Sequence, residues 1–152
     1  MRRHDKEITD RGSIDTIIRK ARVCRIALCD GTTPYLVPMC FGYDGRSLFL
    51  HSANEGRKID ILRQNPKVCF EFETDCEVLP SDKPCSFSMR YRSVVGSGRT
   101  VFVEDLESRH HALQLILRQY SDETFILSDK ALENIVIIRV DIEGITGKQS
   151  RV

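Results

Sequence analysis

Short runs of alternating apolar and polar residues dominate the chain, and this period of two is typical of β-strands with one buried face. Between residues 47 and 52, for example, Leu48 and Leu50 share one face while Phe49 and His51 share the other. The pattern predicts six strands, at residues 23–28, 35–41, 47–52, 67–74, 89–104 and 135–142.

Turn signals separate these strands, and Asp30-Gly31 and Asp44-Gly45 are typical of hairpins. The sheet is therefore expected to be mainly antiparallel. Apolar positions with helical spacing predict three helices, at 13–20, 56–64 and 105–120. Short antiparallel strands with a few peripheral helices favour a mainly β protein built as a β-barrel.

Some strands carry positional signals. Pro38 cannot donate a ladder hydrogen bond, so it predicts an edge, a bulge or a gap that faces a ligand. Gly96 and Gly98 allow the strand at 89–104 to bend. The strand at 135–142 is apolar on both faces and is expected to be central. Residues 76–84 are predicted to form a loop.

Length and charge narrow the class of protein. The 152 residues fit one domain, residues 1–152, and the formal net charge is only +1. A nucleic-acid-binding protein usually shows an excess of basic residues, so this chain is not expected to bind nucleic acid. No apolar run is long enough to predict a membrane span. The charged N-terminus does not resemble a signal peptide, so the expected location is cytoplasmic.

The six cysteines show no paired spacing, and most are expected to be reduced and buried: Cys24, Cys29, Cys40, Cys69, Cys76 and Cys85. The histidines are not spaced as metal ligands, so no metal site is predicted. The nucleophile elbow, the phosphate-binding P-loop and the dinucleotide-binding glycine pattern are all absent.

The sharpest chemical signal lies where the third strand runs into the second helix. Arg57 and Lys58 stand just after Gly56 at the predicted helix start, where the helix dipole is already positive. A bound anion would remove this conflict, and phosphate is the usual candidate. Ser52 can add a hydroxyl group. The alternative is a charged turn exposed to solvent.

Two further groups leave alternatives open. His51 can face a ligand and exchange a proton near neutral pH, or it can be a structural or surface histidine. Arg90 and Arg92 share one face of a strand. They can bind an anion, or they can form salt bridges with Glu71 and Glu73 on the neighbouring strand.

The order of the motifs resembles the pyridoxamine 5′-phosphate oxidase-related flavoproteins, and within them the nitroimidazole-resistance (Nim-like) branch. The resemblance extends from about Lys6 to Lys148. It is carried by YLVPMCFGYD at 35–44, HSANEGRK at 51–58, LRQNPKVC at 62–69, MRYRSVVGSG at 89–98 and ITGK at 145–148.

This resemblance implies a six-stranded antiparallel split β-barrel that forms a homodimer, with FMN, or FAD in its place, between the subunits. Arg57 and Lys58 would hold the flavin phosphate, and His51 and Ser52 would line the adjacent cleft. The remaining implied flavin contacts are the backbone of Val37 and Pro38, together with Arg92 and Ser93, which the partner subunit can supply. Lys148 is a weaker correspondence.

The implied activity is a flavin-dependent reductase acting on a small planar acceptor, such as a nitroaromatic compound or a quinone. His51 would supply a proton or stabilise negative charge on the acceptor. The chain has no tryptophan and lacks the family's C-terminal segment for pyridoxal phosphate, so vitamin B6 oxidation is not expected. Two alternatives are a flavin-binding sensor or carrier without catalysis, and a haem-binding split barrel.

Overall fold

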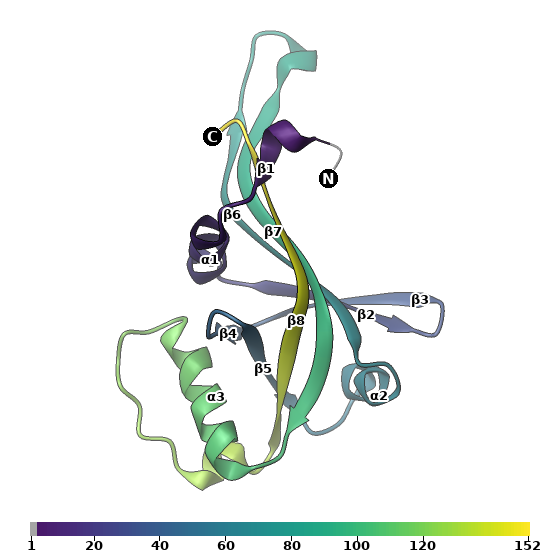
Figure 1. The fold of residues 1–152 in the computed structure, drawn as a ribbon, viewed down its shortest axis with the longest axis vertical. Coiled ribbons are helices and arrows are strands. Elements are labelled where there is room, and N and C mark those ends of the chain that lie inside the picture. Colours follow the sequence, from purple (N-terminus) through teal and green to yellow (C-terminus); the bar gives the residue numbers. More distant parts are fainter. Residues whose placement is uncertain (1–2) are drawn as a thin grey trace.

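The computed structural model describes residues 3–152, in which one antiparallel sheet curls around a core and three α-helices lie against it (Figure 1). The strands are β1 (Glu7–Ile8), β2 (Cys24–Asp30), β3 (Thr33–Met39), β4 (Phe41–Tyr43), β5 (Ser47–Ala53), β6 (Lys67–Leu79), β7 (Ser88–Val103) and β8 (Ile135–Ser150). The helices are α1 (Arg11–Lys20), α2 (Arg57–Gln64) and α3 (Leu106–Arg118), with 3-10 turns at His4–Lys6, Pro84–Ser86 and Asp129–Leu132.

The strand order explains the barrel. It runs β3-β2-β6-β7-β8-β5-β4, so β3 and β4 lie at opposite ends of the order. In the chain, however, only Cys40 separates them. The sheet must therefore curl until its two ends meet, and no ladder joins β3 to β4 among the described residues. This is a split barrel, as predicted.

The strand count is eight in the described residues, and the prediction of six was wrong. The run predicted at 35–41 breaks at Cys40, because β3 pairs with β2 whereas β4 pairs with β5. The two-residue strand β1, which pairs with β8, was not predicted. The strand breaks at Cys40 because the neighbouring strand changes there, and such a change does not alter the alternation of apolar and polar residues.

β6 and β8 extend furthest beyond their predicted ends. β8 pairs with β7 from Ile137↔Val103 to Ser150↔Tyr91, and this long ladder carries the strand through Gly144 and Gly147. β6 continues to Leu79, so the loop predicted at 76–84 was wrong at its start. The predictions of an edge position for Pro38 and a central position for β8 are confirmed by the strand order.

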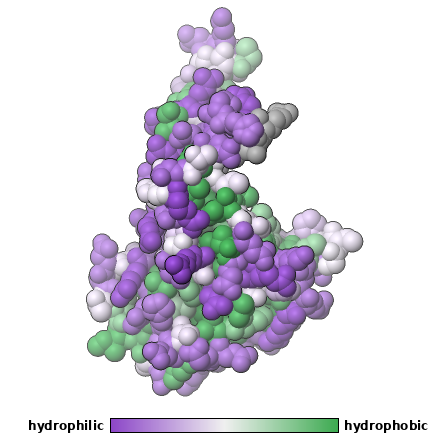
Figure 2. All heavy atoms as spheres, in the orientation of Figure 1, coloured by the Kyte–Doolittle hydropathy of each residue, from purple (hydrophilic) through white to green (hydrophobic). Residues whose placement is uncertain are grey.

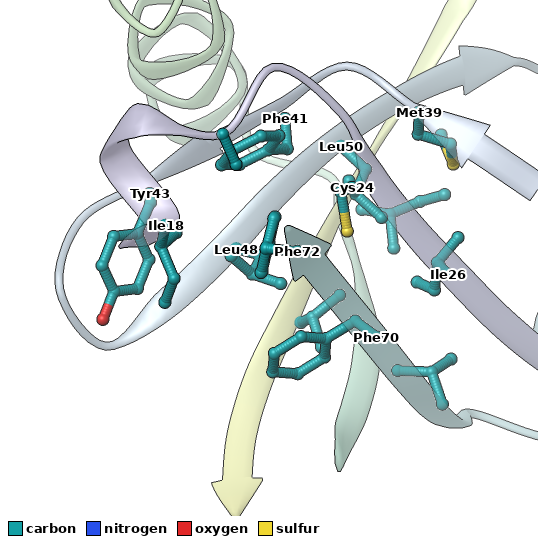
Figure 3. Packing of buried hydrophobic residues seen from close by; sticks show 14 of the residues in the cluster. Ile18, Cys24, Ile26, Met39, Phe41, Tyr43, Leu48, Leu50, Phe70 and Phe72 are labelled. Carbon is teal, nitrogen blue, oxygen red and sulfur yellow. The ribbon is translucent and has the colours of Figure 1, made fainter. Parts of the chain in front are cut away.

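The core is aromatic and lies inside the curled sheet (Figure 3). Phe41 from β4 and Phe72 from β6 are fully buried with ring centroids 4.7 Å apart, and Phe70 lies 5.8 Å from Phe72. A Cβ atom on Gly96 would come within 2.2 Å of the Phe70 ring. The glycine predicted to allow curvature therefore also makes room for the core.

The cysteine prediction was wrong. Only Cys24 is buried, and its burial raises the pKa of the thiol to about 12. The other five cysteines are exposed in the described chain. Cys69, for example, lies on the outward face of β6, since its sequence neighbours Val68 and Phe70 take the inward positions.

The helices begin in two different ways. Asp10 and Asp105 cap α1 and α3, because their carboxylates accept hydrogen bonds from the amides of Ser13 and Ser108. The first helix therefore starts two residues earlier than predicted. α2 has no side-chain cap. None of the helices within residues 3–152 is both long and apolar enough to cross a membrane.

Candidate functional site

The junction between β5 and α2 brings four of the predicted site residues into one segment of the fold. His51 and Ser52 lie near the end of β5, and Arg57 and Lys58 form the first turn of α2. Gly56 precedes the helix with φ of 117°, a conformation that favours glycine. The first amides of any helix lack partners inside the helix, and here no side chain caps them. This end of α2 can therefore donate hydrogen bonds to a ligand.

Arg57 is already engaged. Its guanidinium lies 4.7 Å from the centre of the Tyr35 ring and 3.3 Å from Asp30 Oδ2. Both charged side chains are about half exposed, so this ion pair contributes little to stability. The ion pair instead fixes the position of the start of α2 relative to the β2–β3 hairpin. The sequence analysis missed Asp30 and Tyr35, because no local sequence pattern identifies residues that contact an arginine far away in the chain.

Lys58 is different from Arg57, because within residues 3–152 it has neither a carboxylate partner nor a side-chain hydrogen bond. It is partly buried, and this desolvation lowers the pKa of its ammonium group. A partly buried cation without an anion is unfavourable unless a ligand supplies the charge. The described site therefore fits an anionic group, and a phosphate at an uncapped helix start satisfies both features.

His51 lies close enough to Lys58 to respond to its charge. Burial is the larger cause that lowers the pKa of His51, and repulsion by Lys58 adds to it. His51 projects from the same face of β5 as Phe49, with Ile137 of β8 opposite. The imidazole is thus neutral at pH 7, with an N–H that can donate a hydrogen bond.

The lowered pKa of His51 predicts how the ligand-free protein responds to acid. Because the native state resists protonation, the unfolded chain binds more protons once the pH falls below about 6.5, the ordinary histidine pKa. Stability should therefore decrease as the pH falls through this value. Urea denaturation of the wild type and of His51→Gln across this range checks it, and the variant should show a shallower decrease. Equal slopes would contradict the pKa assignment.

Val37 and Pro38 lie on β3, opposite Ile26 and Arg25 of β2. Val37 is half-buried and Pro38 is exposed. They belong to the neighbourhood of the junction, because the contact between Arg57 and Tyr35 joins β3 to α2. Their backbone is available on one side, since β3 is the terminal strand in the order of the sheet.

Arg92 and Ser93 are not brought to the junction within one chain. Ser93 lies ten residues from Val103 along β7, which is about 33 Å for an extended strand. Val103 pairs with Ile137, which in turn pairs with His51. One chain therefore holds the two predicted halves of the site at opposite ends of the same sheet.

The predicted salt bridges of the arginines on β7 were wrong. Arg25 of β2 takes both acidic partners, with distances of 3.1 Å to Glu71 and 2.8 Å to Glu73. The register explains this, because Arg92 lies opposite Thr74 and so projects from the other face of the sheet. Arg92 is instead 3.7 Å from Asp75, and Arg90 pairs with Glu77.

A split barrel with an uncapped, basic helix start next to its terminal strand defines a class of small β-barrel domains suited to a phosphorylated ligand. The sequence profile described as Pyridoxamine 5′-phosphate oxidase matches residues 10–149. The chain therefore belongs to the pyridoxamine 5′-phosphate oxidase family, as its motifs predicted.

Solved structures agree with this assignment. A protein from Bacteroides thetaiotaomicron, described as a candidate 5-nitroimidazole antibiotic resistance protein, is 38% identical, with a TM-score of 0.85 over 94% of this chain and 86% of that one. A flavocytochrome from Azotobacter vinelandii has a TM-score of 0.86 at 16% identity, over 100% of this chain and 72% of that one. At this lower identity the likeness shows the fold alone.

Two further relatives complete the comparison. A FAD- and haem-binding protein from Mycobacterium smegmatis has a TM-score of 0.82 at 19% identity, over 97% of this chain and 74% of that one. An uncharacterized protein of Rhizobium meliloti is 26% identical over 104 residues, which is 68% of this chain and 62% of that relative. The match thus spans less than two thirds of the Rhizobium protein.

Proposed function

We propose that this protein is an FMN-dependent oxidoreductase that reduces a small planar acceptor, such as a nitroaromatic compound or a quinone. The observation that carries the proposal is Lys58, a partly buried cation that has no acidic partner within residues 3–152 and lies at an uncapped helix start. Family membership supports a flavin as the phosphorylated ligand. The 38% identical structure, described as a candidate nitroimidazole-resistance protein, supports the acceptor class.

Each residue of the junction has a role in this proposal. Lys58 and the first amides of α2 bind the flavin phosphate, Arg57 adds charge from its place beside Tyr35, and Ser52 donates a hydroxyl hydrogen bond. The backbone of Val37 and Pro38 faces the flavin ring. The flavin supplies the redox chemistry, while these residues bind and orient it.

His51 acts on the acceptor side in this proposal. Because the pKa of His51 is lowered, the imidazole is neutral at pH 7 and donates an N–H hydrogen bond. Such a donor stabilises negative charge that develops on a nitro or quinone oxygen. The phosphate also offsets the repulsion from Lys58, which makes it easier for His51 to hold a proton and pass it to the acceptor.

A homodimer completes the site. The outward face of the sheet exposes apolar side chains in the described chain, among them Leu36, Val95 and Val101. A two-fold axis near Gly98 would exchange the two ends of β7. Ser93 of the partner subunit would then lie level with Val103, which is two strands from His51 in the sheet, with the two sheets about 10 Å apart. This arrangement would bring Ser93 of the partner subunit toward the junction, with Arg92 next to it in the chain.

The spectrum of the purified protein tests the proposal. Two broad flavin bands, with FMN identified by mass after release, are expected, together with reduction of a nitroaromatic or quinone by the reduced protein. FAD in place of FMN would correct the cofactor, and an intense Soret band would indicate haem instead. Bound flavin without turnover on any acceptor would favour a sensor or carrier. A protein that takes up no flavin would refute the proposal.

The role of His51 predicts a second result. His51→Ala should lower turnover by about 10²-fold, which is the low end for loss of a positioned acid or base. The bound flavin content should stay near that of the wild type. His110→Ala on α3 is the matched control and should keep full turnover. Unchanged turnover of His51→Ala with FMN bound would show that His51 only lines the cleft.

A further inference from the structure

A hollow of about 490 Å³ lies at the end of the sheet where β5 and β7 finish and β8 begins (Figure 1). Its lining joins Arg63 of α2, Val103 of β7, Arg109 of α3 and Ile135 of β8. The volume is typical of small-molecule sites, which measure about 300–1,000 Å³. None of the residues assigned to the flavin lines this hollow in the described chain. It is therefore a second candidate site.

The charged and apolar side chains of the hollow lie at different depths. Arg63, Glu104 and Glu133 are exposed and form the rim, whereas Arg109 is half-buried. The rest of the floor is apolar and includes Phe102, Val103 and Ile135. Hydrophobic patches between hydrophilic residues are also visible on the lower surface of the molecule (Figure 2). Since water and salt screen the charges at the rim, the charge that acts inside the hollow is positive.

The guanidinium group of Arg109 is held in place by the backbone. Its Nη2 donates hydrogen bonds to the carbonyl oxygens of Leu132 at 2.7 Å and Ile135 at 2.8 Å. Within residues 3–152, its Nε and Nη1 have no hydrogen-bond partner and no carboxylate pairs with it. A half-buried cation with free donors favours an anionic ligand, because such a ligand supplies both the charge and the acceptors.

The wall beside Arg109 is also fixed. The two hydrogen bonds of Arg109 bracket residues 133–134. The next residue of α3, His110, lies 2.7 Å from Asp129 in the 3-10 turn that precedes this segment. Leu132 of the same turn is fully buried. A wall that is already ordered lowers the entropic cost of binding, which favours a small ligand.

We propose that the hollow binds a small aromatic monocarboxylate, whose carboxylate accepts hydrogen bonds from Arg109 and whose ring lies on the apolar floor. Hydrogen bonds between ionised groups are about twice as strong as neutral ones. The ring of Phe102 favours an aromatic body for the ligand. Glu104 and Glu133 at the rim repel additional negative charge, so a monoanion fits better than a phosphate dianion.

Binding of 2-naphthoate, followed by calorimetry and NMR, tests the proposal in the FMN-free and the FMN-loaded protein. Saturable binding is expected, with amide shifts centred on Val103, Glu133 and Ile135 and with the same affinity in both forms. The neutral analogue 2-naphthamide should bind about tenfold more weakly, because it lacks the charge that Arg109 recognises. Inorganic phosphate should also bind more weakly than 2-naphthoate.

Substitutions at the rim test the charge without disturbing the fold. Arg63→Gln should weaken 2-naphthoate binding about threefold, which is typical of an exposed charge. Glu104→Gln should strengthen it about twofold, because a repulsive charge is removed. Arg118→Gln is the matched control and should change nothing, since Arg118 is likewise an exposed arginine in the last turn of a helix but does not line the hollow.

Arg109→Lys keeps the charge but not the donors that the backbone holds in place, so it should weaken 2-naphthoate binding about tenfold. Thermal denaturation shows whether the variant stays folded, and the rim variants decide the question if it does not.

Several results would overturn the proposal. They are absent or unsaturable binding of 2-naphthoate, shifts centred elsewhere, equal affinity for 2-naphthamide or phosphate, and displacement of 2-naphthoate by FMN. The same measurements in the FMN-free protein keep this inference separate from the proposed function, because failure to bind flavin leaves them unchanged.

Discussion

Replacing Lys58 with glutamine is expected to weaken FMN binding about 10- to 150-fold. A hydrogen bond to a charged group contributes about 1.5–3 kcal/mol, and each 1.4 kcal/mol changes a dissociation constant about tenfold. Lys58 is the strongest single contributor we expect at the junction, because no carboxylate within residues 3–152 competes for it. Arg57→Gln should cost less, since Arg57 already pairs with Asp30 and stacks on Tyr35.

The same substitution should act in the opposite direction on the ligand-free protein. Burial lowers the pKa of Lys58, so the charged side chain is unfavourable in the empty site. Lys58→Gln should therefore leave the apoprotein at least as stable as the wild type while it weakens FMN binding. Residues that serve a ligand commonly show this trade-off.

Three measurements check the prediction for Lys58. Titration with FMN gives the dissociation constant, thermal denaturation gives the apoprotein Tm, and NMR gives the pKa of His51. That pKa should rise in Lys58→Gln, because one of its two lowering causes is removed. Lys130→Gln, at an exposed position in the 3-10 turn Asp129–Leu132, should change none of them. Unchanged FMN binding in Lys58→Gln would show that the flavin phosphate does not bind at the junction.

The sequence predicted the elements whose signals are local. The alternation of Leu48 and Leu50 with Phe49 and His51 placed β5, and the helical spacing of apolar residues after Gly56 placed α2. What it missed depends on distant partners. The break at Cys40 follows from strand pairing at the two ends of the sheet, and the pairing of Arg25 with Glu71 follows from the register of β2 on β6.

The residues of the candidate site also fall into those with local sequence signals and those without. His51, Ser52, Arg57 and Lys58 are close in sequence, and the chain necessarily keeps them together. Arg92 and Ser93 were named from the family resemblance, and no periodicity places them next to the junction. In one chain the ladder of β7 on β8 keeps them apart, so the completeness of the site depends on how two copies meet.

A mixing experiment should show that the flavin site is shared between two chains. Lys58→Gln damages the half at the α2 start, and Arg92→Glu damages the half on β7 by placing a negative charge near the flavin. At an FMN concentration that fills neither homodimer, co-refolding the two chains should restore binding. Random association makes half of the dimers mixed, each with one undamaged site, so about a quarter of all sites should bind FMN.

The control mixes two chains whose substitutions both lie in the α2 half of the site. Lys58→Gln mixed with Arg57→Glu leaves every site with one damaged α2 start, so binding should stay at the level of the homodimers. Light scattering verifies that each mixture is dimeric, and two affinity tags isolate the mixed dimers. Arg92 lies eleven residues, or about 36 Å, along β7 from Val103, which is level with His51 in its own chain. Recovery can therefore arise only if the site crosses the interface. Wild-type affinity in Arg92→Glu alone would instead mean that one chain holds the whole phosphate and ring site at the β5–α2 junction.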